Sequence, residues 1–239
     1  MKVEWGKNNM HLQQSKFASA QQLNNSFARR ITTLLSAGIE ENGRASLIVS
    51  GGRTPAGLFE KLSHANLPWE KIDVSLADER WVASGDDASN EKMLRAKLLK
   101  NNAAVANFVG LKTDHSDATE AVEQCTDNLA QMHTPFEVLI LGMGEDGHTA
   151  SLFPCSAQIE QGLDMESGNA YIAVQPTTAA NQRMSLTLPA LLNSKKIFLH
   201  LTGQKKKDVL EQAFAGDDEL AMPIRAVLNN APVELMWAP

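Results

Sequence analysis

The sequence predicts an α/β protein: a single domain over residues 1–239, with a mostly parallel, doubly wound sheet flanked by helices. Two observations lead to this prediction. Short, unbroken apolar runs, typical of strands buried on both faces, alternate along the chain with amphipathic helical patterns. No internal repeat, low-complexity tract or Pro/Ser-rich linker divides the 239 residues, of which 43% are apolar, so we expect one core.

The first helix is predicted between Leu23 and Leu35, because apolar residues recur there at helical spacings, with polar residues between them. The segment NGRA (42–45) breaks the pattern, and ASLIVS (45–50) predicts a buried strand. The turn GGRT leads into a second helix, PAGLFEKL (55–62). Pro55 suits the first helical position, and Thr54 before it is expected to cap the helix.

The same alternation continues to the end of the chain. We expect further strands at IDVSLA (72–77), NFVGL (107–111), FEVLILG (136–142), AYIAVQ (170–175), MSLTL (184–188), KIFLHLTG (196–203) and VELMWA (233–238). We expect further helices at ASNEKMLRAKLL (88–99), at SDATEAVEQCTDNLAQM (116–132) with Ser116 as its N-cap, and at KKKDVLEQAF (205–214).

Composition excludes several classes of function. A net charge of −6 argues against nucleic acid or an anionic membrane as the main partner, because both need a basic surface. Two cysteines cannot form a disulfide framework, which favours a reducing cytoplasm. The first residues lack the apolar core of a signal peptide, and no run of 18 apolar residues predicts a membrane span.

Polar clusters follow four of the predicted strands. SGGRTP follows LIV, DER follows VSLA, GMGEDGH follows VLIL, and TGQKK follows FLHL. Doubly wound sheets bind ligands where the carboxyl ends of strands meet the first turns of helices. We therefore expect the four clusters to converge on one site at one edge of the sheet.

The turn SGGRTP (50–55) has the composition of an anion site. Its two glycines let the backbone approach a ligand closely, and a helix begins at once, so free N–H groups point into the turn. The hydroxyl groups of Ser50 and Thr54 are further donors. An ordinary strand–turn–helix connection stays open as the alternative. The turn is not a Walker P-loop, because no Gly-Lys-Ser/Thr follows.

The segment DERWV (78–82) places two carboxylates and a bidentate donor directly after a buried strand, with a solvated strand end as the alternative. Arg183 and Lys206 lie beside other predicted strand ends. Each alone fits a solvated surface charge; together they would complete an anion pocket with the GGRT turn.

Gly142, Gly144 and Gly147 match the dinucleotide pattern G-x-G-x-x-G after a strand, but three features oppose that interpretation. His148 follows the third glycine directly, Pro154 ends the next helical run early, and no strand ending in an acid follows about twenty residues on.

The alternative for this turn is catalytic. Asp146, two residues before His148, can accept from one imidazole nitrogen and leave the other free as a base. A structural histidine is the alternative, but the neighbouring glycines and acid favour the catalytic role. No histidine pairs with cysteine at metal-ligand spacing, so we expect no metal.

Together these segments resemble the glucosamine-6-phosphate isomerase/6-phosphogluconolactonase family, in particular its lactonase branch. The resemblance covers nearly the whole chain: SLIVSGGRTPAGLFEKL, DERWV, Ser89–Asn90, LILGMGEDGHTASLFP, RMSLTLPALLNS, LTGQKKKDVL and VELMWA. It implies a Rossmann-like sheet, no cofactor, and hydrolysis of 6-phospho-D-glucono-1,5-lactone to 6-phospho-D-gluconate in the oxidative pentose phosphate pathway.

The resemblance also implies roles for particular residues. His148 would be the catalytic base, supported by Asp146. The binding positions for sugar or phosphate would be Gly51, Gly52, Thr54, Arg80, Arg183 and Lys206. We add Asp78 as a group expected to contact the sugar hydroxyls. A small sugar-phosphate lactone is then the expected partner, and the chain is expected to act as a monomer or weak homodimer.

The isomerase/deaminase branch of the same family is the alternative. That branch carries an Asn-Glu-Pro tripeptide after the histidine turn, where this chain has Leu152, Phe153 and Pro154. The missing acid favours the lactonase, since lactone hydrolysis needs only an activated water and a site for the oxyanion. Ala83 and Ser84 depart from the lactonase pattern, which often has proline there, and leave that loop's geometry open. A nucleotide-binding oxidoreductase and a non-catalytic sugar-phosphate sensor are further alternatives.

Overall fold

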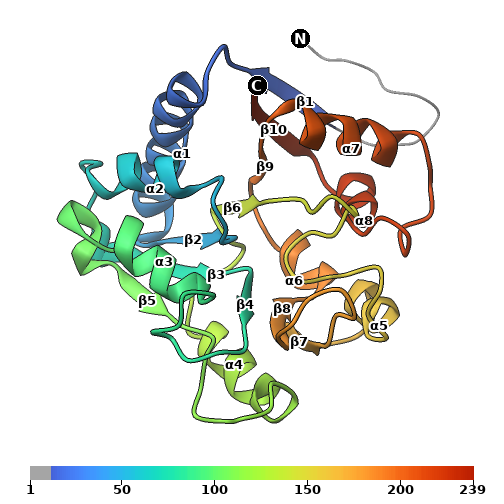
Figure 1. Ribbon diagram of the computed structural model, residues 1–239. Coiled ribbons are helices and arrows are strands. Elements are labelled where there is room, and N and C mark those ends of the chain that lie inside the picture. The colour runs from blue at the N-terminus through green and yellow to red at the C-terminus, as the bar shows by residue number, and fades with distance from the viewer. Residues whose placement is uncertain (1–11) are drawn as a thin grey trace.

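The structure is a computed structural model that describes residues 12–239 (Figure 1). Seven strands form one sheet in the order β1-β10-β9-β6-β2-β3-β5, and every neighbouring pair is parallel. Their bounds are β1 Leu12–Lys16, β2 Ala45–Val49, β3 Ile72–Leu76, β5 Asn107–Val109, β6 Val138–Leu141, β9 Ile197–Thr202 and β10 Val233–Ala238. The predicted α/β class with a mostly parallel sheet is confirmed.

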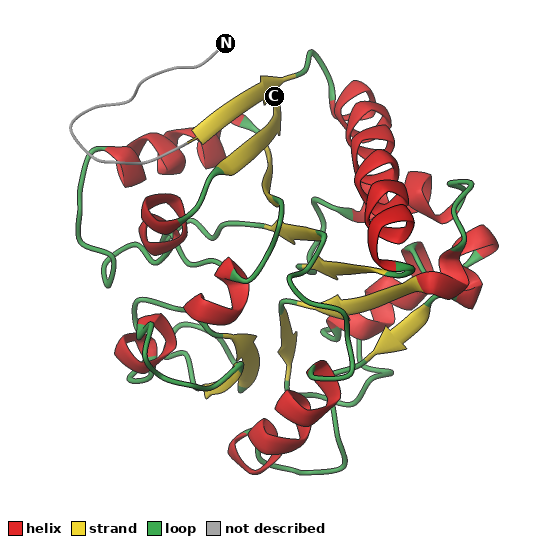
Figure 2. Cartoon of the chain, turned by 180° about the vertical axis from the view of Figure 1, so that it is seen from behind, coloured by secondary structure: helices red, strands yellow, loops and turns green. Residues whose placement is uncertain are grey.

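Helices connect these strands and lie on either side of them, as the view from behind in Figure 2 also shows. The α-helices are α1 Ala20–Asn42, α2 Ala56–Ser63, α3 Asn90–Lys97, α4 Val122–Leu129, α5 Ile159–Leu163, α6 Leu188–Leu192, α7 Gln204–Phe214 and α8 Ile224–Asn230. Three short 3₁₀ helices are Trp69–Lys71, Asn101–Val105 and Thr119–Ala121. Among the described helices, none is long and apolar enough to cross a bilayer.

Helix α1 shows how the apolar spacing becomes packing. Leu23, Phe27, Ile31 and Leu35 are buried, as the helical pattern predicts. Ser19 caps the helix, since its hydroxyl oxygen accepts from the backbone N–H of Gln22, and Gly43 ends it in the left-handed conformation at φ 78°. The predicted break at NGRA is therefore confirmed.

The order of the strands contains one switch point. From β2 the chain builds outward through β3 to β5, and then returns to place β6 on the other side of β2. From β6 it builds outward in the opposite direction through β9 to β10, and β1, which precedes β2 in the chain, lies at that edge beside β10. Ligands of such sheets bind outside the carboxyl ends of the strands at this point. The two flanking turns are residues 50–55 after β2 and residues 142–148 after β6.

A second, small sheet lies apart from the parallel one (Figure 1). It consists of β4 Asp78–Arg80, β8 Arg183–Leu186 and β7 Tyr171–Val174, which pair antiparallel. The strands predicted at 170–175 and 184–188 exist, but they are not part of the main sheet. The DER segment, predicted to follow a buried strand, is itself a short strand that pairs with β8.

Two predicted helix caps are wrong. Helix α2 begins at Ala56 with Pro55 as N-cap, and no side chain caps it, because Thr54 lies one residue too early. Helix α4 begins at Val122, after a 3₁₀ turn, and not near Ser116. Asp117 starts that turn by accepting from the backbone N–H of Thr119 (2.8 Å).

Candidate active site

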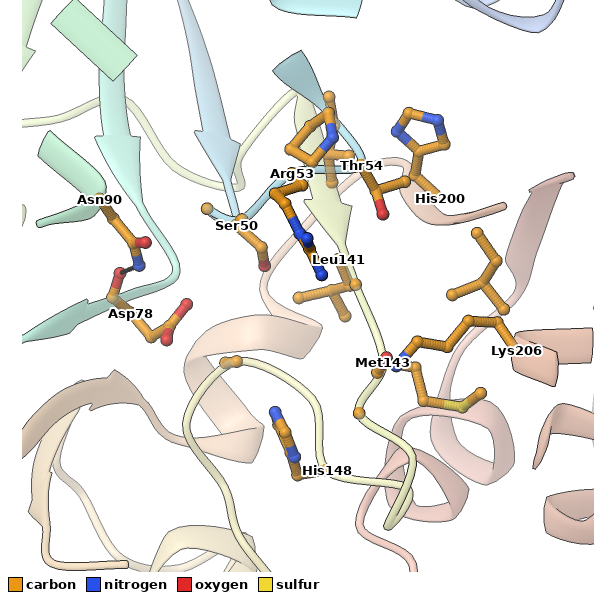
Figure 3. A pocket seen from close by; sticks show the side chains of 18 of the residues that line it. Ser50, Arg53, Thr54, Asp78, Asn90, Leu141, Met143, His148, His200 and Lys206 are labelled. Atoms are coloured by element: carbon orange, nitrogen blue, oxygen red, sulfur yellow. Dashed lines mark hydrogen bonds between the residues drawn. The ribbon is translucent and has the colours of Figure 1, made fainter. Parts of the chain in front are cut away.

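A pocket of about 260 Å³ lies at the switch point of the parallel sheet (Figure 3). Its walls come from the turn after β2, from strand β4, from the turn after β6, and from the end of β9 with the first turn of α7. The predicted convergence of four strand ends is thus seen. The pocket is lined by these predicted site residues: Gly51, Gly52, Thr54, Asp78, Arg80, His148 and Lys206.

The turn Ser50–Pro55 supplies one wall of the pocket. Ser50 N donates to the carbonyl of Ile140 (2.9 Å), which ties the turn to β6. Gly52 has φ 94°, a conformation that residues with a side chain rarely adopt. The hydroxyl of Ser50 is buried and has no hydrogen-bond partner in the described chain. Since Thr54 does not cap α2, its hydroxyl also stays available to a ligand.

His148 and Asp146 form a close pair on the turn after β6. The Nδ1 of His148 lies 2.6 Å from Oδ1 of Asp146, which also accepts from the backbone N–H of His148 (3.2 Å). No partner for Nε2 is found in the described chain, and Figure 3 shows the ring pointing from its loop toward the pocket. Asp146 stands behind the ring and does not line the pocket.

The charge of this pair follows from its surroundings. Partial burial alone would raise the pKa of Asp146, but the hydrogen bonds and charge of His148 together hold that pKa below its usual range. Asp146 therefore stays ionised near neutral pH. A carboxylate at Nδ1 favours the tautomer with its proton on Nδ1, which leaves Nε2 as an acceptor.

The turn that carries this pair has no room for a side chain at Gly144. A Cβ at Gly144 would overlap the imidazole of His148. The backbone closes through Gly144 N to His148 O (2.8 Å), and Gly147 O accepts from Ile224 N (2.9 Å). Within the described chain no helix starts at this turn, and α5 begins only at Ile159. A dinucleotide site of the G-x-G-x-x-G type would need a helix directly after the turn.

Strand β4 carries two carboxylates with different surroundings. Asp78 lines the pocket and accepts from the hydroxyl of Ser151 (2.6 Å). Glu79 points the other way and accepts from the backbone N–H groups of Arg80, Asn90 and Glu91 (each 2.7 Å). Burial is the largest effect on Glu79 and raises its pKa, against the lowering by these three donors. Glu79 therefore holds the start of α3 in place, and the expectation that all of DER faces a site is wrong for it.

Two arginines lie side by side next to the pocket. Arg80 and Arg183 are directly opposite each other in the β4–β8 pairing. Arg80 donates to the carbonyl of Ala88 (2.6 Å). Arg183 does not line the pocket; it is 9% exposed, and its Nε and Nη1 have no partner in the described chain. Burial first, and then the charge of Arg80, lower the pKa of Arg183. Like charges in this position are unfavourable unless an anion joins them.

Lys206 reaches the pocket from the first turn of α7. Its Nζ donates to the carbonyl of Met143 (2.8 Å), on the turn that also carries His148. Burial lowers the pKa of Lys206, against the raising effect of Glu145 and Asp146. The amine is thus held in a fixed place near the histidine turn.

The prediction of site residues missed several that line the pocket. Arg53 extends over it from the glycine turn, and Asn90 reaches it from α3 (Figure 3). Asn90 had a signal, because it belongs to the Ser-Asn pair that carries the family resemblance. His200 on β9 is buried, and burial lowers its pKa to about 4. The sequence did not mark His200 as a pocket residue, because it lies within a strand of mostly apolar residues.

The described residues contain no group of three or more His, Cys, Asp or Glu side chains placed to hold a metal ion.

Comparison with known proteins gives concordant results. Residues 18–237 match the family model described as glucosamine-6-phosphate isomerases/6-phosphogluconolactonase. A 6-phosphogluconolactonase from Rhizobium meliloti (strain 1021) is 40% identical over 97% of this chain and 99% of its own. One from Pseudomonas aeruginosa is 38% identical over 93% of each chain. The crystal structure of a 6-phosphogluconolactonase from Shewanella baltica OS155 superposes with a TM-score of 0.95 at 41% identity, covering 98% of this chain and all of that one.

Proposed function

The chain belongs to the glucosamine-6-phosphate isomerase/6-phosphogluconolactonase family, and we propose that it uses His148 as a general base to hydrolyse 6-phospho-D-glucono-1,5-lactone. The product is 6-phospho-D-gluconate, and the reaction belongs to the oxidative pentose phosphate pathway. The lactone hydrolysis itself rests on the relatives, which are named 6-phosphogluconolactonases and match along almost their whole length. The histidine mechanism rests on the geometry of the site.

One observation carries the mechanism: Nδ1 of His148 is held by Asp146 at 2.6 Å, and the ring lines the pocket with Nε2 unpartnered within the described chain. In the proposed reaction, Nε2 takes a proton from a water molecule as that water attacks the C1 carbonyl of the lactone. The resulting imidazolium then gives the proton to the ring oxygen as the C1–O bond breaks. General base catalysis of this kind contributes about 10²–10⁴-fold.

The negative oxygen that forms at C1 needs donors. We place it near the backbone N–H groups of a glycine turn that lines the pocket. Such groups are already oriented before the reaction, so no free energy is spent on reorienting them as the charge develops. Asp78, fixed by Ser151, faces the pocket as an acceptor for sugar hydroxyls. A site of this kind orients a strained ester that already hydrolyses slowly in water, so no covalent nucleophile is needed.

The phosphate of the substrate supplies orientation through binding far from the reacting carbon. The proposed ligands are the backbone at Gly51 and Gly52, the hydroxyl of Thr54, and the cations Arg80, Arg183 and Lys206. The unpartnered nitrogens of Arg183 support this proposal, because a buried guanidinium beside another arginine is unfavourable without an anion. The buried, unpartnered hydroxyl of Ser50 adds a further donor to the same wall of the pocket.

The deaminase/isomerase activity of the sister branch is less well supported. Its proton shuttle requires an acid near the histidine. Here the ring of Phe153 lies against His148 instead, with centroids 4.1 Å apart. Asp146 is the carboxylate bonded to that imidazole in the described chain, and it is occupied at Nδ1.

A coupled assay tests the proposed function. The purified chain is mixed with freshly made 6-phosphogluconolactone, and the product is trapped by 6-phosphogluconate dehydrogenase with NADP⁺, so that turnover is read as NADPH after subtraction of spontaneous hydrolysis. The proposal predicts turnover far above the spontaneous rate. Binding of 6-phosphogluconate without turnover would indicate a sensor, and ammonia release from glucosamine 6-phosphate would indicate the sister activity.

We also propose a cytoplasmic location and a monomeric or weakly dimeric state. Both cysteines, Cys125 and Cys155, are free, which fits a reducing compartment. Sedimentation at several concentrations tests the oligomeric state.

A further inference from the structure

The imidazole of His148 is stacked on an aromatic ring. The rings of His148 and Phe153 have centroids 4.1 Å apart and an angle of 30° between their planes. Phe153 is 7% exposed, whereas the side chain of His148 is 28% exposed. One face of the partly exposed imidazole is thus stacked on a buried phenyl ring.

The hydrogen bond to Asp146 does not fix the imidazole by itself. Side-chain exposure of 28% for His148 and 40% for Asp146 leaves water free to compete for this bond. A single bond at Nδ1 also leaves the plane of the ring free to tilt about it. A second contact, on the face of the ring, is therefore needed to keep Nε2 directed into the pocket. Phe153 makes that contact.

The loop between the two residues is folded to bring them together. Leu152 N donates to Thr149 O (3.0 Å), and the same two residues form an isolated β-bridge, so the chain doubles back directly after His148. Within this turn Ala150 has φ 47°, a left-handed conformation that is unfavourable for residues other than glycine. The chain therefore tolerates local strain in the segment that returns Phe153 to the imidazole.

Phe153 is itself held from another side of the site. The guanidinium carbon of Arg183 lies 6.0 Å from the centroid of the Phe153 ring. Arg183 belongs to β8, in the small antiparallel sheet, whereas His148 belongs to the turn after β6. Phe153 thus connects the catalytic turn to the sheet that carries the two arginines.

We propose that Phe153 is a positioning residue for the reaction: its ring fixes the plane of the His148 imidazole, and so the direction of Nε2 toward the attacking water. This inference rests on the proposed function, and it extends it to a residue that does not itself line the pocket. The role is orientation alone, since a phenyl ring exchanges no proton.

The test compares Phe153→Leu, which keeps an apolar side chain but removes the ring, with Phe153→Tyr, which keeps the ring. We expect Phe153→Leu to lower kcat about tenfold or more and to leave KM within about twofold of the wild type. The reason is that a small change in the orientation of a general base lowers the rate strongly. Phe153→Tyr should retain a kcat within about threefold of that of the wild type. Phe108→Leu is the matched control, because Phe108 also lies under an arginine (4.8 Å to Arg95) but belongs to β5, at one edge of the main sheet, and not to the loop that carries His148.

A second measurement does not depend on turnover. Imidazole ¹⁵N NMR of the resting protein at alkaline pH reports which nitrogen of His148 carries the proton. We expect one predominant tautomer, with the proton on Nδ1, in the wild type and in Phe153→Tyr, and a mixture in Phe153→Leu. If the wild type lacked lactonase activity, the proposed function would fail, while this spectrum would still test the positioning.

Two results would overturn the inference. One is a Phe153→Leu variant with wild-type kcat and an unchanged tautomer of His148. The other is an equal loss in Phe153→Leu and Phe153→Tyr, accompanied by a lower melting temperature in both, which would mean that Phe153 serves packing only.

Discussion

Replacing Asp146 by asparagine removes the negative charge beside the imidazole of His148, the proposed general base, and keeps the shape of the side chain. The bond to Nδ1 is 2.6 Å long and charge-assisted, a class worth about 1.5–3 kcal/mol. Asp146 is 40% exposed, so solvent screening reduces the expected loss to about 1–2 kcal/mol. If the imidazolium forms in the transition state, this loss appears in kcat as a fall of about 5- to 30-fold.

The substrate affinity of this variant should not change. Asp146 does not line the pocket, so KM for the phosphorylated lactone should stay within about twofold of the wild type. The coupled dehydrogenase assay measures both constants. Asp117→Asn is a matched control, because Asp117 makes the same two-residue contact to the backbone N–H of Thr119 outside the site. A normal kcat in Asp146→Asn, or a raised KM with normal kcat, would refute the reasoning.

Three further predictions concern binding and stability. Arg183→Ala and Lys206→Ala should each raise KM for the phosphorylated lactone more than for unphosphorylated gluconolactone; equal effects on both substrates would mean that these cations do not bind the phosphate. Glu79→Ala should lower the free energy of unfolding by about 2–4 kcal/mol in urea, because three backbone N–H groups, two at the start of α3 and one on Arg80 of β4, lose their acceptor; a loss below about 1 kcal/mol would show that water replaces it. Burial lowers the pKa of His200 from 6.5 to about 4. Between these pH values the unfolded chain binds a proton at His200 and the folded chain does not. The free energy of unfolding should therefore fall by up to about 3 kcal/mol as the pH falls from 6.5 to 4. His200→Phe should remove that part of the pH dependence, and a curve parallel to the wild type would contradict it.

The parallel sheet was predictable because its strands are buried on both faces. The segments at β2, β3, β6 and β9 are short and rich in apolar residues, and polar clusters mark the ends where they stop. The carboxyl ends of parallel strands lie at the same edge of a sheet, so the pocket could be anticipated from the polar clusters that follow the strands. His148 stood out for the same reason, since it follows glycines at a strand end.

The small antiparallel sheet was not predictable in this way. Strand β4 has three residues and pairs with β8, about a hundred residues further along the chain, and no local pattern encodes that pairing. The position of Arg183 behind Phe153, opposite Arg80, depends on it. The stacking of Phe153 on His148 likewise depends on a loop that doubles back without a helical or strand period.

The predicted N-caps of two helices were also wrong, and the reason lies in the local sequence. Thr54 precedes Pro55, as a capping residue often does, but the helix starts one residue later, and Thr54 lines the pocket instead. Ser116 does not cap a helix, because the carboxylate of the next residue, Asp117, accepts from the backbone N–H of Thr119 and starts a 3₁₀ turn there. Both residues had suitable chemistry for a cap, but the N-cap of α2 is Pro55, one residue after Thr54, and that of α4 is Ala121, five residues after Ser116.

The imidazole of His148 as general base is the central claim, and the kinetics of His148→Ala test it most directly. The coupled assay should show kcat lowered by about 10²–10⁴-fold with KM changed only modestly, since the phosphate ligands stay in place. Turnover within a few-fold of the wild type would contradict the claim and remove His148 from the mechanism.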